Sequence, residues 1–191
     1  MTNSRREFPV SSYNSVRVTP FTEKHLSEKY VSWLNDPVVV RYSEQRHVKH
    51  TLQTCEAYYV GQQISSNYFL AIELEDGEML SHVGNIGVAV DKNNNTADMS
   101  ILVGDRLVWG CGVGSRAWIA VMMTLLATLN FRTITAGTMS VNEPMLALFN
   151  RSGMKMNGVI PGRFLWEGTE VDLIIASIHQ PVLQQNNLNA T

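Results

Sequence analysis

Apolar and polar residues repeat with two different periods along the chain, and each change of period predicts a new element. A short alternating stretch over 15–19 predicts a strand. Apolar residues spaced three and four apart then predict two helices, over 22–36 and 49–65. Alternation returns over 67–104, where turn-rich breaks divide it into three successive short strands. The first half of the chain therefore predicts a strand, two helices and an antiparallel meander.

The second half alternates between helices and strands. Residues 115–130 are apolar around nearly the whole helical circumference, which predicts a helix buried on several sides. A strand is expected over 132–139, a helix over 142–153 that begins at an Asn142 cap, and a last strand over 171–179. The order β-αα-βββ-α-β-α-β is typical of a mixed α+β fold with a mostly antiparallel sheet, flanking helices and one parallel crossover.

Size and charge narrow the class of protein. The 191 residues, 45% of them hydrophobic, fit a single domain over 1–191, with an ordered core over about 15–180 and loose termini. A net charge of -2 gives no electrostatic case for nucleic acid or an anionic membrane as a partner. No apolar stretch approaches the ~20 residues needed to cross a bilayer. We therefore expect neither nucleic acid nor a membrane as a partner.

Cysteine use bears on the compartment. Cys55 and Cys111 are the two cysteines, and nothing in the sequence requires them to form a bridge. The N-terminal stretch has arginines without an apolar segment behind them, so no secretory signal is expected. A reduced, cytoplasmic protein is the expectation.

A glycine-rich loop stands where the third meander strand gives way to the apolar helix. In "VWGCGVGSRAW" three glycines occupy alternate positions, Gly110, Gly112 and Gly114. Backbone N–H groups from Cys111 to Arg116, at the start of a helix, suit a pyrophosphate, and Arg106 beside the loop could pair with further phosphate charge. A bare turn is the alternative, although a turn needs one glycine rather than three.

A dinucleotide-binding loop is a second alternative. Gly112, Gly114 and Ala117 match G-x-G-x-x-A between a strand and a helix. That motif expects an acidic residue about 20 positions later, at the end of the next strand. Here the strand "TITAGTM" holds no acid, and Glu143 lies beyond it in a helix. The sequence therefore favours a pyrophosphate of another kind.

Three segments together resemble one family. "WGCGVG" with the helix after it, "TADMSILVGD" before it and "NEPMLALFNRSGM" downstream are similar, in this order, to motifs of the GNAT N-acetyltransferases. The resemblance covers roughly residues 15–180 and is closest to the RimJ/RimL-like subfamily. It implies acetyl-CoA as co-substrate, no metal, and a twisted sheet whose two central strands splay apart around the thioester. Trp109 stands where many members have Arg or Gln.

The resemblance also implies which residues contact the cofactor. Free backbone amides near "ILV" would hold the pantetheine, the glycine loop would hold the pyrophosphate, and Asn142 would touch the cofactor. The expected cofactor residues are Ile101, Leu102, Val103, Trp109, Gly110, Cys111, Gly112, Val113, Gly114, Ser115, Arg116, Asn142 and Phe149.

Acetyl transfer to an amine needs a base, because an ammonium has no lone pair. Asp98 occupies the position of the family's frequent strand glutamate, and it is our catalytic candidate, acting through a water because Asp is one methylene shorter. Glu73 and Glu44 are weaker candidates, and Glu73 is expected to face solvent near the end of its strand. His82 is a further candidate for the base.

The proton for the departing thiolate is harder to assign. The family's usual tyrosine falls on Phe149, which has no proton to give. Ser140, our second catalytic candidate, Ser152 and Tyr42 could replace it, or the thiolate could leave unassisted, since its pKa lies near ~8.5. A non-catalytic CoA-binding module is the remaining alternative, and Cys111 as a nucleophile is disfavoured because that loop position acts through its backbone.

The acceptor is expected near the first two helices. The segment "YVSWLNDPVVVRYSEQRHVKHT" gathers stacking and hydrogen-bonding groups, and its W-L-N-D-P-x-V-x-R-Y pattern looks like that of enzymes which acetylate nucleotide-linked amino sugars. The expected substrate residues are Trp33, Asn35, Arg41, Tyr42, Arg46 and His82. Core packing and helix capping are the structural alternative for this segment. A protein N-terminus and another small amine, including an antibiotic, are the alternative acceptors, and a homodimer is left open.

Overall fold

The computed structural model describes residues 7–13, 15–76 and 79–180. Within them one sheet runs in the order β1-β2-β3-β4-β5-β6-β8-β7. The termini expected to be loose lie largely outside the described residues, at 1–6 and 181–191. Phe8, in contrast, is buried against the Tyr68 ring at 5.4 Å, so the ordered core begins earlier than expected.

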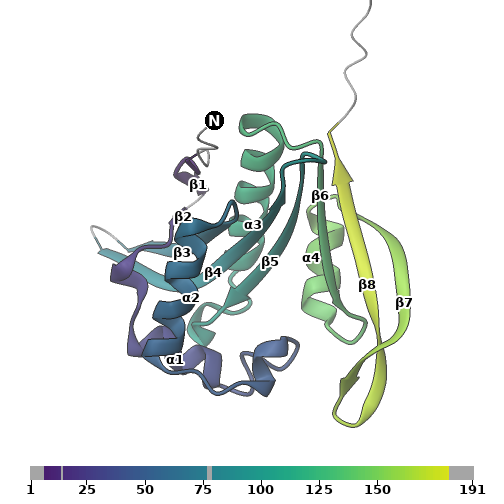
Figure 1. Cartoon of the computed structure of the whole chain (residues 1–191), viewed down its shortest axis with the longest axis horizontal. Coiled ribbons are helices and arrows are strands. Elements are labelled where there is room, and N and C mark those ends of the chain that lie inside the picture. The colour runs from purple at the N-terminus through teal and green to yellow at the C-terminus, as the bar shows by residue number, and fades with distance from the viewer. Residues whose placement is uncertain (1–6, 14, 77–78, 181–191) are drawn as a thin grey trace, which may run out of the picture.

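The elements follow one another with short connections (Figure 1). The strands are β1 Ser11–Tyr13, β2 Val16–Pro20, β3 Tyr68–Asp76, β4 Met79–Asp91, β5 Thr96–Val103, β6 Thr133–Met139, β7 Lys155–Trp166 and β8 Thr169–His179. The α-helices are α1 Glu28–Asn35, α2 Leu52–Ile64, α3 Val113–Met123 and α4 Glu143–Arg151. Short 3-10 turns are η1 Glu23–His25, η2 Glu44–His47 and η3 Arg106–Val108, and a π turn, η4 Thr124–Thr128, continues α3.

Helices cover both faces of the sheet, as the α+β prediction requires. On one face, α3 and α4 enclose the larger core, where Trp118 and Phe149 are fully buried with Leu70 of β3. On the other face, α1 and α2 pack over Phe69 and Ala71 of the same strand. Successive residues of β3 point to opposite faces, so a continuous apolar strand serves two cores.

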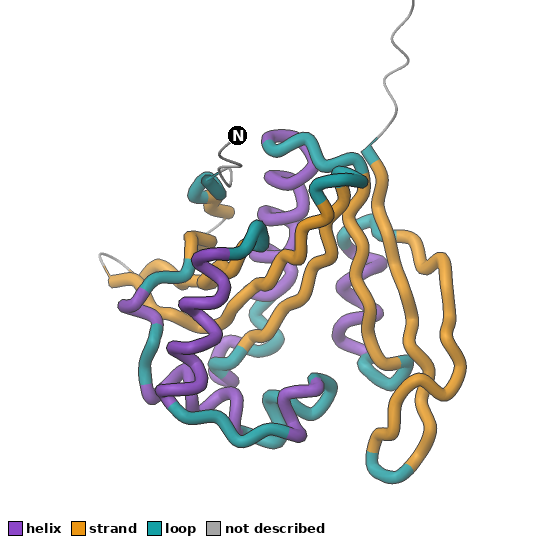
Figure 2. The backbone as a smooth tube through the Cα atoms, in the orientation of Figure 1, coloured by secondary structure: helices purple, strands orange, loops and turns teal. Residues whose placement is uncertain are grey.

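The sheet is antiparallel except between β5 and β6, which are joined by the crossover through α3. In the described chain, their parallel ladder covers three pairs, Thr96↔Thr133, Ala97↔Ile134 and Asp98↔Thr135. Beyond this the strands diverge: β5 stays with β4, while β6 stays with β8 (Figure 2). The expected splayed strand pair is confirmed.

Two local expectations were wrong. The expected helix over 22–36 is divided into η1 and α1, because Thr22 donates its N–H to the side chain of His25 and Ser27 caps a new helix. Strand β7 was not predicted, because Gly158, Pro161 and Gly162 break its alternation. An edge strand tolerates such residues, since one side of it carries no ladder.

No helix in the described part of the chain is long and apolar enough to cross a membrane.

Candidate active site

Asp98 and Thr135 form the last pair before β5 and β6 part. The Thr135 hydroxyl donates a hydrogen bond of 2.7 Å to Asp98 Oδ2. Partial burial raises the pKa of Asp98 above its ordinary value, and the hydrogen bond from Thr135 opposes that rise. Ser100, two residues along the same face of β5, lies about 7 Å further towards the open end. A carboxylate therefore stands where the strands separate.

Gly112 caps α3 in a left-handed conformation, with φ of +76°. Gly110 has the same φ, and a Cβ on either residue would meet no atom within 4 Å. The N–H groups of Val113, Gly114 and Ser115 begin the helix, so no carbonyl of a preceding turn accepts from them. This gives an open, positively polarised backbone surface that fits a diphosphate.

The loop is joined to the end of β5. The Trp109 indole donates from Nε1 to the carbonyl oxygen of Val103 at 2.9 Å. A Cβ on Gly114 would lie 3.1 Å from Cγ2 of Val103, so the glycine permits the close approach of α3 to the strand. The start of α3 is thus fixed beside the strand opening.

Fewer backbone N–H groups are available to a ligand than the expected run from Cys111 to Arg116. The Cys111 N–H bonds the carbonyl of Val108, and the Arg116 N–H bonds that of Gly112. The Arg116 guanidinium donates to the Cys111 carbonyl at 2.9 Å, and Arg106 pairs with Asp36 at 3.6 Å. Both arginine side chains therefore already have partners within the protein.

The thiols of Cys55 and Cys111 are free and form no disulfide bond.

A cavity of about 360 Å³, which we call the Tyr30 pocket, lies on the face covered by α1 and α2. Its floor is formed by β4 and β5, where Asn85 pairs with Leu102 and Gly87 with Ser100. The lining residues are Tyr30, Leu34, Ser43, Gln45, Val48, His50, Thr54, Cys55, Tyr58, Phe69, Asn85, Gly87, Ser100, Ile101 and Leu102. Asp98 precedes Ser100 by two residues on the same strand face, so the carboxylate lies in line with this floor.

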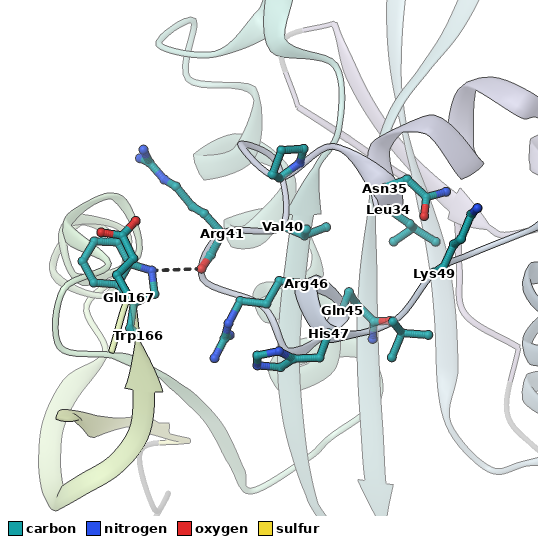
Figure 3. A pocket seen from close by; sticks show the side chains of 12 residues that line it. Leu34, Asn35, Val40, Arg41, Gln45, Arg46, His47, Lys49, Trp166 and Glu167 are labelled. Atoms are coloured by element: carbon teal, nitrogen blue, oxygen red, sulfur yellow. Dashed lines mark hydrogen bonds between the residues drawn. The ribbon is translucent and has the colours of Figure 1, made fainter. Parts of the chain in front are cut away.

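A second, more open cavity of about 550 Å³, the Trp166 pocket, adjoins the first and shares Leu34, Gln45 and Val48 with it (Figure 3). The Trp166 indole, from the last residue of β7, donates to the Arg41 carbonyl at 3.1 Å. The Tyr42 ring stacks on Trp166 with centroids 5.7 Å apart. These contacts join the loop before α2 to the β7–β8 hairpin at the edge of the sheet.

The expected substrate residues divide between this pocket and the core. Arg41, Asn35 and Arg46 line the Trp166 pocket, whereas the Trp33 side chain is buried against Gly104. Core packing encloses the Trp33 indole, and a substrate contact through it stays a prediction. Tyr42 lies in the loop contact described above.

Two of the lining residues already have structural partners. The Asn35 amide bridges Val31 and His50, through the His50 N–H and the carbonyls of both residues. The Arg46 guanidinium donates to the carbonyls of Ser43 and Leu165 and pairs with Glu44 at 2.9 Å. Arg41, whose guanidinium lies 4.6 Å from the Tyr42 ring, is the better candidate for a ligand contact.

In the downstream motif "NEPMLALFNRSGM", the polar side chains of Asn142 and Ser152 make contacts within the protein. Asn142 caps α4 through the Met145 N–H and donates to Thr138 Oγ1. Phe149 is 0% exposed, so its ring fills the core, and a cofactor contact through it stays a prediction. Ser152 donates to the carbonyls at the end of α4 and is buried, which removes it as a proton donor.

Ser140 lies just beyond β6, at the wide end of the opening. Its Oγ accepts a hydrogen bond from the Asp172 N–H at 3.2 Å. The hydroxyl proton is not used in that contact, so Ser140 keeps the ability to donate.

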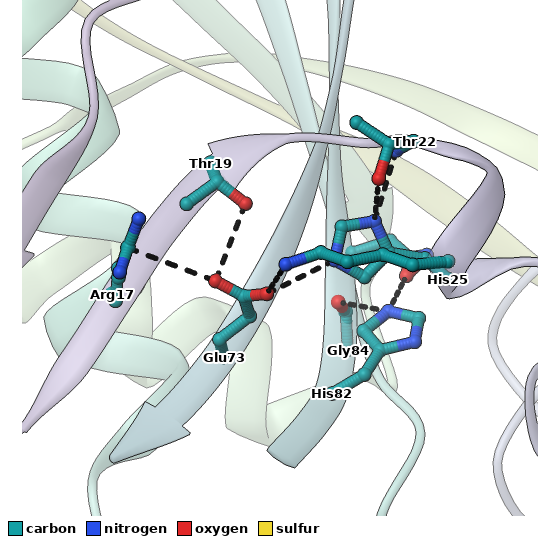
Figure 4. Close-up of polar contacts among 9 residues, drawn as sticks. Arg17, Thr19, Thr22, His25, Glu73, His82 and Gly84 are labelled. Carbon is teal, nitrogen blue, oxygen red and sulfur yellow. Dashed lines mark hydrogen bonds and ion pairs between the residues drawn. The ribbon is translucent and has the colours of Figure 1, made fainter. Parts of the chain in front are cut away.

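Glu73 does not face solvent, contrary to expectation. Its side chain is 2% exposed and pairs with Lys24 at 2.7 Å, His25 at 3.1 Å and Arg17 at 3.8 Å (Figure 4). Burial favours a higher pKa, but the hydrogen bonds from Lys24 and His25 outweigh it and hold the pKa of Glu73 below its usual range. A strand bulge at Ile72/Glu73 turns the carboxylate inward. Glu73 is thus a structural ion-pair centre rather than a base.

His82 lies beside this cluster, 4.9 Å from the His25 ring between centroids. Burial lowers the pKa of His82 to about 4, so the imidazole is neutral at pH 7. The ring nitrogen Nε2 faces two oxygens, Gly84 O at 3.0 Å and Asn85 Oδ1 at 2.8 Å. These contacts commit His82 to holding Asn85, which leaves Asp98 as the better placed base.

Sequence reasoning missed three site residues. Asn85 and Ser100 sit inside ordinary strand patterns, and Trp166 ends a strand that was not predicted. A glycine opposite Ser100 and the polar Asn85 amid apolar neighbours in "HVGNIGVAV" were signals that could have marked the first two.

A family model for the acetyltransferase (GNAT) domain matches residues 15–155. The chain belongs to the GNAT acetyltransferase family. Comparison with curated proteins finds no sequence match. In this acetyltransferase, the opening between β5 and β6 and the start of α3 are therefore where the family motifs expected from the sequence meet.

Solved structures share the fold of this acetyltransferase. A GNAT-family acetyltransferase from Bacillus anthracis superposes with a TM-score of 0.75 at 16% identity, over 90% of this chain and 98% of that chain. Spermidine N-acetyltransferase from Vibrio cholerae, in complex with CoA and spermine, gives 0.78 at 14% identity, over 88% and 97%. Ribosomal-protein-alanine N-acetyltransferase from Brucella melitensis gives 0.70 at 16%, over 85% and 99%. At these identities the likeness shows the fold.

Proposed function

We propose that this GNAT enzyme transfers the acetyl group of acetyl-CoA to a primary amine on a small molecule, of which a nucleotide-linked amino sugar is the favoured class. The observation that carries the proposal is the strand opening after Asp98 and Thr135, with the open start of α3 beside it. Both reactants bind together, and the amine attacks the thioester directly.

Acetyl-CoA is proposed to lie with its pyrophosphate on the first N–H groups of α3. The open space beyond Gly110 and Gly112 supports this, because a Cβ at either position would take up that space. The pantetheine follows β5, where the edge of Ile101–Val103 that faces the opening has no β6 partner. An amide of this edge can donate to the thioester carbonyl as negative charge develops.

Asp98 is proposed as the base that removes a proton from the acceptor ammonium through a water. Its position at the parting of the strands and its raised pKa support the role. The amine nitrogen then bonds to the thioester carbon and gives up its second proton to water, the C–S bond breaks, and the thiolate leaves. Ser140 is the candidate to protonate it, although a thiolate can also leave unassisted.

The acceptor is proposed to place its amine-bearing part in the Tyr30 pocket. The adjoining Trp166 pocket contains Arg41 and Lys49, which would suit an anionic part such as a diphosphate. A protein N-terminus is the second candidate, and the openness of the mouth beside Trp166 favours it, because a peptide would have to leave the pocket there.

The test measures thiol release from acetyl-CoA over a panel of amines, together with the thermal shift caused by CoA. Amine-dependent release with a nucleotide-linked amino sugar above a peptide N-terminus is the expected result. A CoA-induced shift without release from any amine would instead indicate a non-catalytic CoA-binding module.

A further inference from the structure

Asn85 is a buried amide at the floor of the Tyr30 pocket. It is 5% exposed, and its Nδ2 atom is buried without a hydrogen-bond partner of good geometry. It lies on β4 directly opposite Leu102 of β5, on the strand segment proposed to hold the thioester. The NH₂ group has two N–H donors, and the Tyr30 hydroxyl can accept from one of them. A buried N–H group left unpaired is costly, so the remaining donor in the pocket wall points to a ligand oxygen.

His82 determines which way the Asn85 amide faces. Figure 4 shows the contact between His82 and Gly84 O; because this oxygen can only accept, His82 Nε2 must carry the ring proton. The same N–H then also faces Asn85 Oδ1 at 2.8 Å. Asn85 therefore presents its oxygen to His82 and its NH₂ group to the opposite side, where Tyr30 and the pocket lie.

The rest of the pocket wall is uncharged. Among the described lining residues there is no Asp, Glu, Lys or Arg. Burial raises the pKa values of Tyr30, Tyr58 and Cys55, so these groups stay protonated at pH 7. His50 adds a second buried ring nitrogen, Nε2, without a partner. A second ammonium of an acceptor would find no carboxylate here, whereas hydroxyl or carbonyl oxygens would find donors.

We propose that Asn85 is a specificity-determining residue which donates a hydrogen bond to an oxygen of the acceptor, and that His82 is its positioning residue. The acceptor class that fits is an oxygen-rich primary amine, such as an amino sugar, and not a polyamine. This inference rests on the proposed function, since it concerns the acceptor of the same reaction.

The experiment compares two amines of equal ring size, D-glucosamine and cyclohexylamine, with spermidine as a polycation. Thiol release from acetyl-CoA gives kcat and KM for each. The wild-type enzyme is expected to favour glucosamine over both other amines. Asn85→Leu should raise KM for glucosamine about tenfold and leave KM for cyclohexylamine nearly unchanged, because the lost donor matters only to an oxygenated ligand.

Two further variants separate recognition from stability. His82→Leu should reduce the glucosamine preference in KM, and His82→Gln, which can still donate to Asn85, should restore part of it. Asn67→Leu removes an amide that holds the Val90 N–H, away from the pocket. It should lower the melting temperature without changing the ratio of the two amines.

An unchanged amine ratio in Asn85→Leu would overturn the inference while leaving the acetyltransferase assignment intact. Spermidine turned over better than glucosamine would overturn it as well. No thiol release from any amine, with no CoA-induced thermal shift, would overturn the proposed function itself.

Discussion

Asp98 and Thr135 are hydrogen bonded at 2.7 Å across the last pair of the β5–β6 ladder. If Asp98 is the base, Asp98→Asn should lower kcat about a hundredfold or more, and most at lower pH. The pH dependence follows because an amine above its own pKa is already deprotonated and needs less help. A pH profile of thiol release measures this, and wild-type turnover at low pH would clear Asp98 of the role.

Thr135→Val removes the donor that lowers the pKa of Asp98. The pKa should rise further, so the acid limb of kcat/KM should move to higher pH. Thr133→Val is the matched control, since its hydroxyl contacts His179 instead, one step away on the same strand face. Equal profiles for the two variants would contradict a link between Thr135 and the base.

Gly112→Asp should abolish the thermal shift caused by CoA, because it places a carboxylate where the diphosphate is proposed to lie. Gly114→Asp should abolish it as well, because its side chain would meet Val103 and push the start of α3 away from β5. Gly153→Asp is the control. Gly153 has the same φ of +76° as Gly112 and equally open space around a Cβ, but it follows α4. The Gly153→Asp variant should lose stability through backbone strain and keep the thermal shift caused by CoA. Differential scanning fluorimetry distinguishes the two results.

Trp166→Leu removes both the stacking on Tyr42 and the hydrogen bond to Arg41 O. The loop before α2 should loosen, so KM for the acceptor should rise about tenfold while the CoA shift stays unchanged. Phe164→Leu, on the same hairpin, is the control and should leave KM unchanged. A loss of CoA binding in Trp166→Leu would show that the contact serves the whole fold.

Stability should fall as the pH drops from 6.5 to 4. The pKa of His82 is about 4 in the folded protein and 6.5 in the unfolded chain, so the unfolded chain binds more protons in this window. The full contribution is about 3 kcal/mol, present above pH 6.5. His25, whose pKa burial also lowers, acts in the same direction.

Urea unfolding at several pH values measures this dependence. His82→Gln should flatten the slope between pH 6.5 and 4, whereas substitution of the exposed His47 should leave it. Equal slopes for wild type and His82→Gln would contradict the assignment.

The order of elements was predictable where hydrophobic periodicity decides the structure. The meander, α3 and the crossover to β6 follow from period and glycine placement, and the structure confirms them. Strand β7 was not predicted, because the glycines and the proline that interrupt its alternation are tolerated only at a sheet edge. No local sequence pattern reveals that a strand lies at an edge. The division of η1 from α1 depends on His25 reaching Glu73, which is 48 residues away.

The candidate site residues divide in the same way, into those that a local sequence pattern marks and those whose environment depends on distant parts of the chain. The break between β5 and α3 at Gly110 and Gly112 was predictable from the glycines alone, whereas their contact with the cofactor stays a prediction. The sequence could not decide whether Trp33 packs in the core or faces a ligand, since its burial depends on the close approach of Gly104. Asn85 is marked in the sequence only by a polar side chain amid apolar neighbours, because the proposed role depends on His82 and on a pocket formed by helices distant in sequence.

The parting of β5 and β6 means that one reactant need not pass the other. The thiol carrier would approach past the start of α3, and the amine from the side of α1 and α2 (Figure 1). Each product could then depart by the route its precursor used. Free coenzyme A should accordingly compete with acetyl-CoA but not with the amine in product-inhibition kinetics.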